Sequence, residues 1–171
     1  MSAAKNMALA RRFMEARVKG DLDAMDEMLA PDFVNQNKLL PGQEPDREDY
    51  LRGIAAFHAA LSPGRLIIED QVAGGDKVVT RFVVHATHDR GELMGVAPTG
   101  REMTLMPVLI QRIEGGKIAE EWGSSMGISE LLRSQRLEQE VRERERGEQE
   151  LRVARGIQQA SLPKVVPILE G

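Results

Sequence analysis

Three histidines are the side chains of this sequence that could exchange protons near neutral pH: His58, His85 and His88. His85 and His88 stand three positions apart in a run typical of a β-strand, so their side chains point to opposite faces and cannot bind one metal ion together. His58 follows Phe57 on an expected helix, where packing or exposure is commoner than catalysis. The chain has no cysteine, which removes thiol catalysis, thiolate metal sites and disulfides. We therefore expect no metal site and no bound cofactor.

Length and charge narrow the class of protein. The 171 residues suffice for one domain and an appendage, and 42% of them are apolar, which is enough for a core. The net charge of −4 and the pI near 5.5 disfavour nucleic acid binding. No apolar run approaches the ~20 residues that span a bilayer, and the N-terminus resembles an amphipathic helix rather than a signal peptide. We expect a soluble cytoplasmic protein without a membrane partner.

The stretch 98–126 contains the strongest strand pattern. Two runs of strand-forming residues flank Gly115-Gly116, a dipeptide that permits a tight hairpin. The first run, 103–113, is apolar at both alternating sets of positions, whereas a strand with one face in water alternates with polar residues. One face should therefore meet helices or a cavity, and the other a second sheet or a second subunit. This pattern predicts a homodimer.

Helices are expected before the strands. Apolar residues recur at helical spacing in 3–19 and after Asp21, and a third helix is capped by Asp46 and stopped by Pro63-Gly64. Four strands are expected, at 65–73, 77–87, 101–113 and 117–124. Helices followed by an antiparallel sheet indicate an α+β fold. We assign residues 1–128 to this domain, 129–162 to a charged helix and 163–171 to the start of a linker.

Several short motifs occur in the order found in one family. They are Thr87-His88, Gly91, Gly95, Pro98-Thr99-Gly100-Arg101, Gly116-Lys117-Ile118, Glu120 and Trp122, preceded by the strings at 20–23 and 31–34. Over residues 5–132 the sequence thus resembles the SnoaL-like polyketide cyclases. The resemblance implies the cone-shaped fold of the nuclear-transport-factor-like superfamily. In that fold a curved antiparallel sheet wraps around N-terminal helices, encloses a pocket and usually forms a dimer.

Two positions depart from the cyclases of that family. A histidine that follows the Pro-Asp-Phe-Val string is replaced by Gln36, and an aspartate four residues after the tryptophan, the general acid/base, is replaced by Met126. Neither an amide nor a thioether can remove and return a proton. The resemblance therefore implies a pocket that is kept, with Gln36, His88, Met106, Trp122 and Met126 as ligand-contacting residues and no catalytic residue.

Three functions remain open. The first is a ligand-binding sensory domain of a bacterial signalling protein, which takes a small, mostly apolar molecule with one or two hydrogen-bonding groups. The second is a small cyclase, isomerase or hydrolase that uses His88 or another pocket group. The third is a dimerisation module with a solid core. We favour the first, because Gln36 and Met126 cannot transfer protons.

The C-terminal segment predicts a long helix. Residues 131–161 contain no proline and several Glu–Arg pairs at the i,i+4 spacing that supports helices. Leu137, Val141 and Leu151 fall on a heptad seam, with Arg144 and Glu148 between them. Since the seam is weak, a coiled coil and a solvated helix are both compatible with it.

The string 151–167 is similar to the linker that enters SpoIIE-type serine/threonine phosphatase domains. The matching residues are Ala154, Arg155, Ile157, Gln158, Leu162 and Pro163. This resemblance implies that the helix relays the state of the first domain to a phosphatase output domain, and that the chain is the N-terminal part of a longer protein.

Overall fold

The computed structural model of the chain describes residues 2–37, 42–123 and 128–161. The chain forms two compact units, divided between Leu132 and Arg133. Two of the sequence-based expectations, the pocket role of Met126 and the linker start at 163–171, lie outside the described residues.

Three helices open the first unit: α1 (Ala3–Lys19), α2 (Leu22–Met28) and α3 (Arg47–Ala60). The Asp21 carboxylate accepts a hydrogen bond from the Ala24 N–H at 3.1 Å, and the Asp46 carboxylate accepts one from the Asp49 N–H at 2.8 Å. Both predicted N-caps are therefore confirmed. Gly20 follows α1 as its C-cap, and its φ of 73° lies in the left-handed region that favours glycine.

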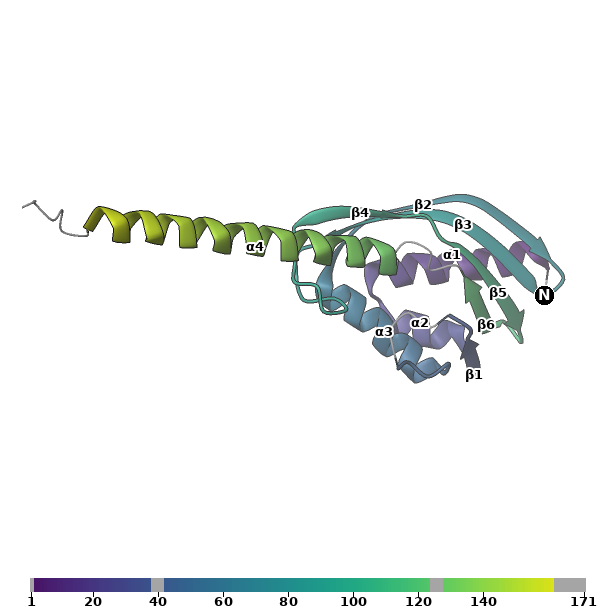
Figure 1. The fold of residues 1–171 in the computed structure, drawn as a ribbon. Helices are drawn as coiled ribbons and strands as arrows, with labels where there is room; N and C mark the ends of the chain where they lie inside the picture. Colours follow the sequence, from purple (N-terminus) through teal and green to yellow (C-terminus); the bar gives the residue numbers. More distant parts are fainter. Residues whose placement is uncertain (1, 38–41, 124–127, 162–171) are drawn as a thin grey trace, which may run out of the picture. The chain divides into compact units, whose positions relative to one another are not determined.

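Six strands form one curved sheet that passes over α1 (Figure 1). The strands are β1 (Leu29–Asn35), β2 (Leu61–Gly74), β3 (Lys77–His88), β4 (Arg101–Leu105), β5 (Val108–Glu114) and β6 (Lys117–Gly123). Their order is β1-β6-β5-β3-β2, and β4 also pairs with β3. Strands β1 and β6 run parallel, whereas the other pairs are antiparallel. The predicted α+β fold with N-terminal helices and a curved antiparallel sheet is confirmed, except that the β1–β6 pair is parallel.

The strand expected at 101–113 is divided into β4 and β5. Both halves pair with β3, and the register is the same on each side of the break, since Leu105 faces Val84 and Val108 faces Arg81. The break contains Pro107, which has no N–H to donate to the neighbouring strand. Pro107 therefore interrupts the hydrogen bonds to β3 without changing the direction of the chain.

Strand β2 begins earlier than the sequence predicts. Pro63 and Gly64 were expected to stop α3, but the helix ends at Ala60 and both residues lie inside β2. Proline is tolerated here because β2 is an edge strand, and its register with β3 shifts between Pro63 and Leu66. The helix thus passes directly into the sheet.

Aromatic side chains from three elements meet in the core of the first unit. The ring of Tyr50 on α3 lies 6.3 Å from the ring of Phe13 on α1 and 5.1 Å from the ring of Phe33 on β1. All three side chains are buried. This cluster fixes α1 and α3 against the sheet and sets the position of the Tyr50 hydroxyl.

Strand β5 presents two different faces. Leu109, Gln111 and Ile113 are buried, whereas Val108 and Ile110 on the other face are half-buried. The chain itself therefore covers one of the two apolar faces that the sequence indicated. That a second subunit covers the other face of β5 remains a prediction.

The second unit consists of most of α4 (Ile128–Ser161), a helix of 34 residues. Gly147 lies within it, and the helix continues through this position. The long C-terminal helix predicted from the sequence is confirmed. Within the described residues, no helix is both long enough and apolar enough to cross a membrane.

Gly64→Ala tests the close contact between β2 and β3. A Cβ at Gly64 would lie 2.5 Å from the backbone oxygen of His85, so one of the two strands must move. We expect the substitution to lower the free energy of unfolding by about 1–3 kcal/mol, measured by urea denaturation. Gly74→Ala in the same strand is the control, since among the described residues no atom other than those of its chain neighbours lies within 4 Å of its Cβ position. Equal stability of the two variants would contradict the contact.

Candidate functional site

A cavity of about 140 Å³ lies between α1, α3 and the inner face of the sheet. Most of its wall is apolar. The apolar lining residues are Met14, Val18, Ile54, Phe57, Leu61, Pro63, Phe82, Val84, Ala86, Leu105, Pro107 and Leu109. An apolar cavity of this size can hold a molecule about as large as benzene, or the apolar part of a larger one.

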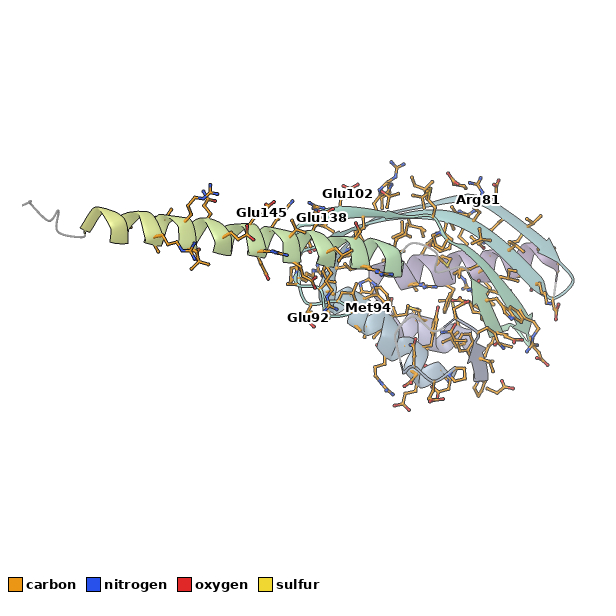
Figure 2. The ribbon with its side chains drawn as sticks, in the orientation of Figure 1. Arg81, Glu92, Met94, Glu102, Glu138 and Glu145 are labelled. Atoms are coloured by element: carbon orange, nitrogen blue, oxygen red, sulfur yellow. The ribbon has the colours of Figure 1, made fainter. Side chains whose placement is uncertain are left out.

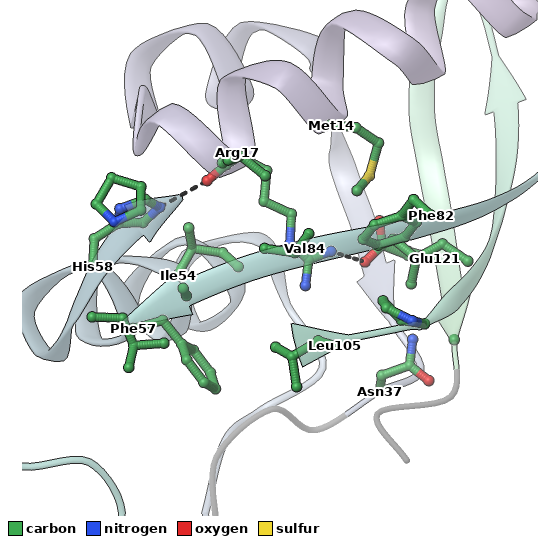
Figure 3. A pocket seen from close by; sticks show the side chains of 17 residues that line it. Met14, Arg17, Asn37, Ile54, Phe57, His58, Phe82, Val84, Leu105 and Glu121 are labelled. Carbon is green, nitrogen blue, oxygen red and sulfur yellow. Dashed lines mark hydrogen bonds and ion pairs between the residues drawn. The ribbon is translucent and has the colours of Figure 1, made fainter. Parts of the chain in front are cut away.

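Four residues place polar groups in this wall: Arg17, Asn37, His58 and Glu121. Figure 3 shows Arg17 extending from α1 towards Glu121 on β6. The two residues come from helix and sheet, and 104 positions separate them in the chain. The cavity therefore joins apolar walls to a small set of charged and polar groups, as ligand sites commonly do.

The carboxylate of Glu121 is the most buried of these groups, with 1% of the residue exposed. Its Oε1 accepts hydrogen bonds from Arg17 Nη1 at 3.2 Å and from the Tyr50 hydroxyl at 3.0 Å. Its Oε2 accepts one from Gln111 Nε2 at 2.8 Å. Arg17 Nη1 also lies 3.2 Å from the Tyr50 hydroxyl oxygen. Three neighbours thus satisfy a charge that would be costly to bury alone.

Burial and charge shift two pKa values in this network. Burial lowers the pKa of Arg17, but Tyr50 and Glu121 raise it by more, and the net shift is upward. Burial also raises the pKa of Tyr50 well above its ordinary value; Arg17 opposes this shift and Glu121 adds to it. Arg17 is therefore cationic and Tyr50 neutral over the physiological range, so the tyrosine acts as a hydrogen-bond donor.

His58 forms another part of the wall. Its Nε2 lies 2.8 Å from the backbone oxygen of Arg17, and a carbonyl can only accept, so Nε2 carries the proton (Figure 3). The ring packs against Gly20, where an added Cβ would come within 2.9 Å of Nδ1. Of the two roles expected for this histidine, packed or exposed, these contacts agree with the packed one.

Asn37 adds an amide to the cavity. Its Nδ2 is buried and has no hydrogen-bond partner within the described part of the chain. Its backbone is held by Asn35, whose Oδ1 accepts from the Asn37 N–H at 3.0 Å. A buried donor without a partner costs about 1–3 kcal/mol. This amide is therefore a candidate contact for an acceptor atom of a ligand.

Two of the five residues predicted to contact a ligand make other contacts. His88 is fully buried at the end of β3, and its Nε2 donates to the backbone oxygen of Gly91 at 2.9 Å. Gln36 is exposed, and its Nε2 donates to Glu120 Oε1 at 2.7 Å. Neither residue lines the cavity described above.

Trp122 and Met106 also lie away from this cavity. The Lys77 ammonium sits 5.3 Å from the centre of the Trp122 ring, a cation–π contact. Met106 is 72% exposed. Met126, the fifth residue, lies outside the described residues. The structure therefore does not bring the predicted set together around the cavity.

Arg17 and Glu121 are site residues that the sequence patterns did not predict. One feature of the sequence pointed to Glu121. It stands two positions after Ala119 on the inward-facing side of β6, where a charged residue is unusual. On α1, Arg17 stands next to the apolar stripe that contains Phe13 and Met14. Only the tertiary structure shows that these two charges meet. In residues 2–37, 42–123 and 128–161, no group of three His, Cys, Asp or Glu side chains could hold a metal ion.

The raised pKa of Tyr50 can be measured directly, because it is the only tyrosine of the chain. The folded protein holds this proton more tightly than the unfolded chain. Its contribution to stability is therefore fully present below about pH 10 and is lost as the pH rises towards the folded-state pKa. We expect the tyrosinate absorbance of the native protein to appear at higher pH than in denaturant. Coincident curves would contradict the buried network, and Tyr50→Phe supplies the blank.

Comparison with known proteins places this geometry in a family. The model of the SnoaL-like polyketide cyclases matches residues 8–125. No curated protein matches the chain. The family model ends before the string 151–167, and nothing in the comparisons supports the likeness of that string to a phosphatase linker.

Solved structures agree with the family match. IdmH, a polyketide cyclase candidate from Streptomyces antibioticus, is 31% identical, with 72% of this chain and 93% of that chain covered at a TM-score of 0.59. AclR, a hydroxylase candidate from Streptomyces galilaeus, is 29% identical, with 72% and 90% covered at 0.61. TsrD from Streptomyces laurentii is 26% identical, with 72% and 90% covered at 0.63. The chain therefore belongs to the SnoaL-like polyketide cyclase family.

Proposed function

We propose that residues 8–125 bind a small, mostly apolar molecule in the cavity, with an oxygen atom of that molecule held by Arg17. The observation that carries this proposal is a cationic guanidinium in an otherwise largely apolar wall. A guanidinium has five N–H groups, and in the described part of the chain the hydrogen bonds of this side chain, to Tyr50 and Glu121, leave from Nη1. The remaining N–H groups can donate to a carbonyl or enolate oxygen.

The reaction we propose is proton transfer next to a carbonyl group, the step that opens many ring closures and isomerisations. Arg17 would stabilise the negative charge that develops on the oxygen, and it would do so more strongly where a bound ligand and the apolar wall exclude water. Glu121 would accept the proton. Within the described residues its Oε2 accepts one hydrogen bond, from Gln111, and so keeps a lone pair for this purpose.

The departures at Gln36 and Met126 do not exclude such a reaction. Both were inferred to remove proton-transferring groups, but Glu121 supplies a carboxylate in the wall of the cavity. Among the relatives, IdmH is named as a polyketide cyclase candidate, which supports a ring-closing reaction type. We therefore rank a small cyclase or isomerase above the sensory domain.

A sensory domain is the second candidate, and α4 is the observation that favours it. This helix begins beyond the part matched by the family model and exposes several large apolar side chains. In this alternative, the domain at 1–128 binds its ligand without turnover, the helix at 129–162 carries the signal, and 163–171 leads to a phosphatase output domain. The same cavity and the same apolar ligand class serve both candidates.

Deuterium exchange separates the two candidates. Apolar aryl ketones with hydrogens next to the carbonyl would be incubated with the protein in D2O, and binding would be followed by calorimetry. We expect Arg17→Lys to weaken binding about tenfold or more, because a charge-assisted hydrogen bond contributes about 1.5–3 kcal/mol. Leu105→Trp should block binding by filling the cavity from β4.

The control is Arg81→Lys, which changes an exposed arginine on the outer face of the sheet (Figure 2). This variant should bind like the unmodified protein. Ketone exchange that Glu121→Gln abolishes supports the enzyme, whereas binding without exchange supports the sensory domain. If neither Arg17→Lys nor Leu105→Trp weakens binding, the ligand binds outside this cavity, which would contradict both candidate functions. Circular dichroism confirms that each variant is folded.

A further inference from the structure

Exposed apolar side chains are concentrated on α4. Eight large apolar side chains are exposed in the described part of the chain, and five of them belong to this helix. They are Leu137, Val141, Leu151, Val153 and Ile157. Apolar side chains gathered on one element mark a surface that another molecule covers.

Three of these side chains lie on one stripe of the helix. Positions that alternate four and three residues apart stay on the same side of a helix that winds around a partner. On α4 this stripe contains Leu137, Val141, Arg144, Glu148, Leu151 and Arg155. We call these six residues the α4 stripe. Val153 and Ile157 lie off it.

The charges in the α4 stripe decide how two copies could pair. In a parallel pair each stripe residue faces its own copy. Arg144 would then face Arg144, Glu148 would face Glu148, and Arg155 would face Arg155. Like charges that are brought together at a helix interface repel each other. A parallel pair in register is therefore disfavoured at three of its six layers.

An antiparallel pair removes these conflicts. We propose that α4 pairs with α4 of a second copy of the chain in antiparallel orientation, with the axis of symmetry at Arg146. In this register Val141 faces the partner's Leu151, and Arg144 faces the partner's Glu148. Leu137 faces the partner's Arg155, whose aliphatic stem can cover it. Each of these contacts occurs twice.

Half of the central Arg144–Glu148 contact is already present within a single α4 helix. Arg144 Nε lies 3.2 Å from Glu148 Oε1 within one helix, and both side chains are exposed. In the antiparallel pair, two arginines and two glutamates form a ring of alternating charge around the axis. Beside the stripe, Glu138 comes next to the partner's Arg152, which adds a further opposite-charge contact.

Two residues near the axis are compatible with this register. Gly147 offers no side chain at the crossing point, and nothing lies within 4 Å of its Cβ position in a single helix. Glu145 comes near its own copy, but it projects from the helix into solvent, where water and salt weaken the repulsion (Figure 2). The balance of charges thus favours the antiparallel pair.

Engineered disulfides test the orientation, and the absence of natural cysteines makes the readout clean. Val141→Cys and Leu151→Cys are introduced singly into the full chain, expressed separately and together, and oxidised. We expect a disulfide-linked dimer when the two variants are co-expressed, and none from either variant alone. Val153→Cys, which is exposed but lies off the α4 stripe, is the matched control and should not cross-link.

A charge exchange tests the register. In the co-expressed cysteine variants, Arg144→Glu should abolish the cross-link, and adding Glu148→Arg should restore it. Arg136→Glu disrupts a similar exposed pair outside the α4 stripe and should leave the cross-link unchanged. Cross-linking of Val141→Cys with itself would show a parallel pair, and no cross-link in any variant would show that another molecule or water covers the stripe. Either result would overturn the proposal.

Discussion

The buried ion pair between Glu121 and Arg17 ties two helices of the first unit to its sheet. Only 1% of Glu121 is exposed, and its carboxylate can stay in the interior only if hydrogen-bond donors surround it. Removing one partner of a buried ion pair typically lowers the free energy of unfolding by about 3–5 kcal/mol. The donors to Glu121 come from α1, α3 and β5, so satisfying the charge fixes both helices against the sheet. The apolar cavity lies where these elements meet, and the charged pair gives it a polar side.

Alternation along β6 explains why the site differs from the predicted one. Neighbouring side chains of a strand point to opposite faces, so Glu121 and Trp122 cannot both line the cavity. Glu121 takes the inner face, and Trp122 takes the outer face, where it meets Lys77. The same alternation separates Gln111 from Ile110 on the adjacent strand. The inner face therefore carries a line of polar groups that no single segment reveals.

Local patterns predicted most of the fold, because they depend on neighbours in the chain. Helix caps such as Asp21 and Asp46 and the Gly115-Gly116 turn act over a few residues, and the structure contains all of them. Local sequence patterns gave a wrong or incomplete prediction where a tertiary contact decides the structure. Pro63 was expected to end the third helix, yet it lies inside an edge strand, which accepts proline. Arg17 and Glu121 are far apart in the sequence, so their meeting could not be predicted from either segment.

We propose that Arg17 holds an oxygen of an apolar ligand inside this cavity. A crystal structure of the full chain grown with an aryl ketone tests it most directly. We expect the ketone to lie among Phe57, Val84 and Leu105, with its oxygen about 2.7–3.2 Å from a guanidinium nitrogen of Arg17. A ketone bound elsewhere, or side chains that fill the cavity and leave no space for it, would contradict this role of Arg17.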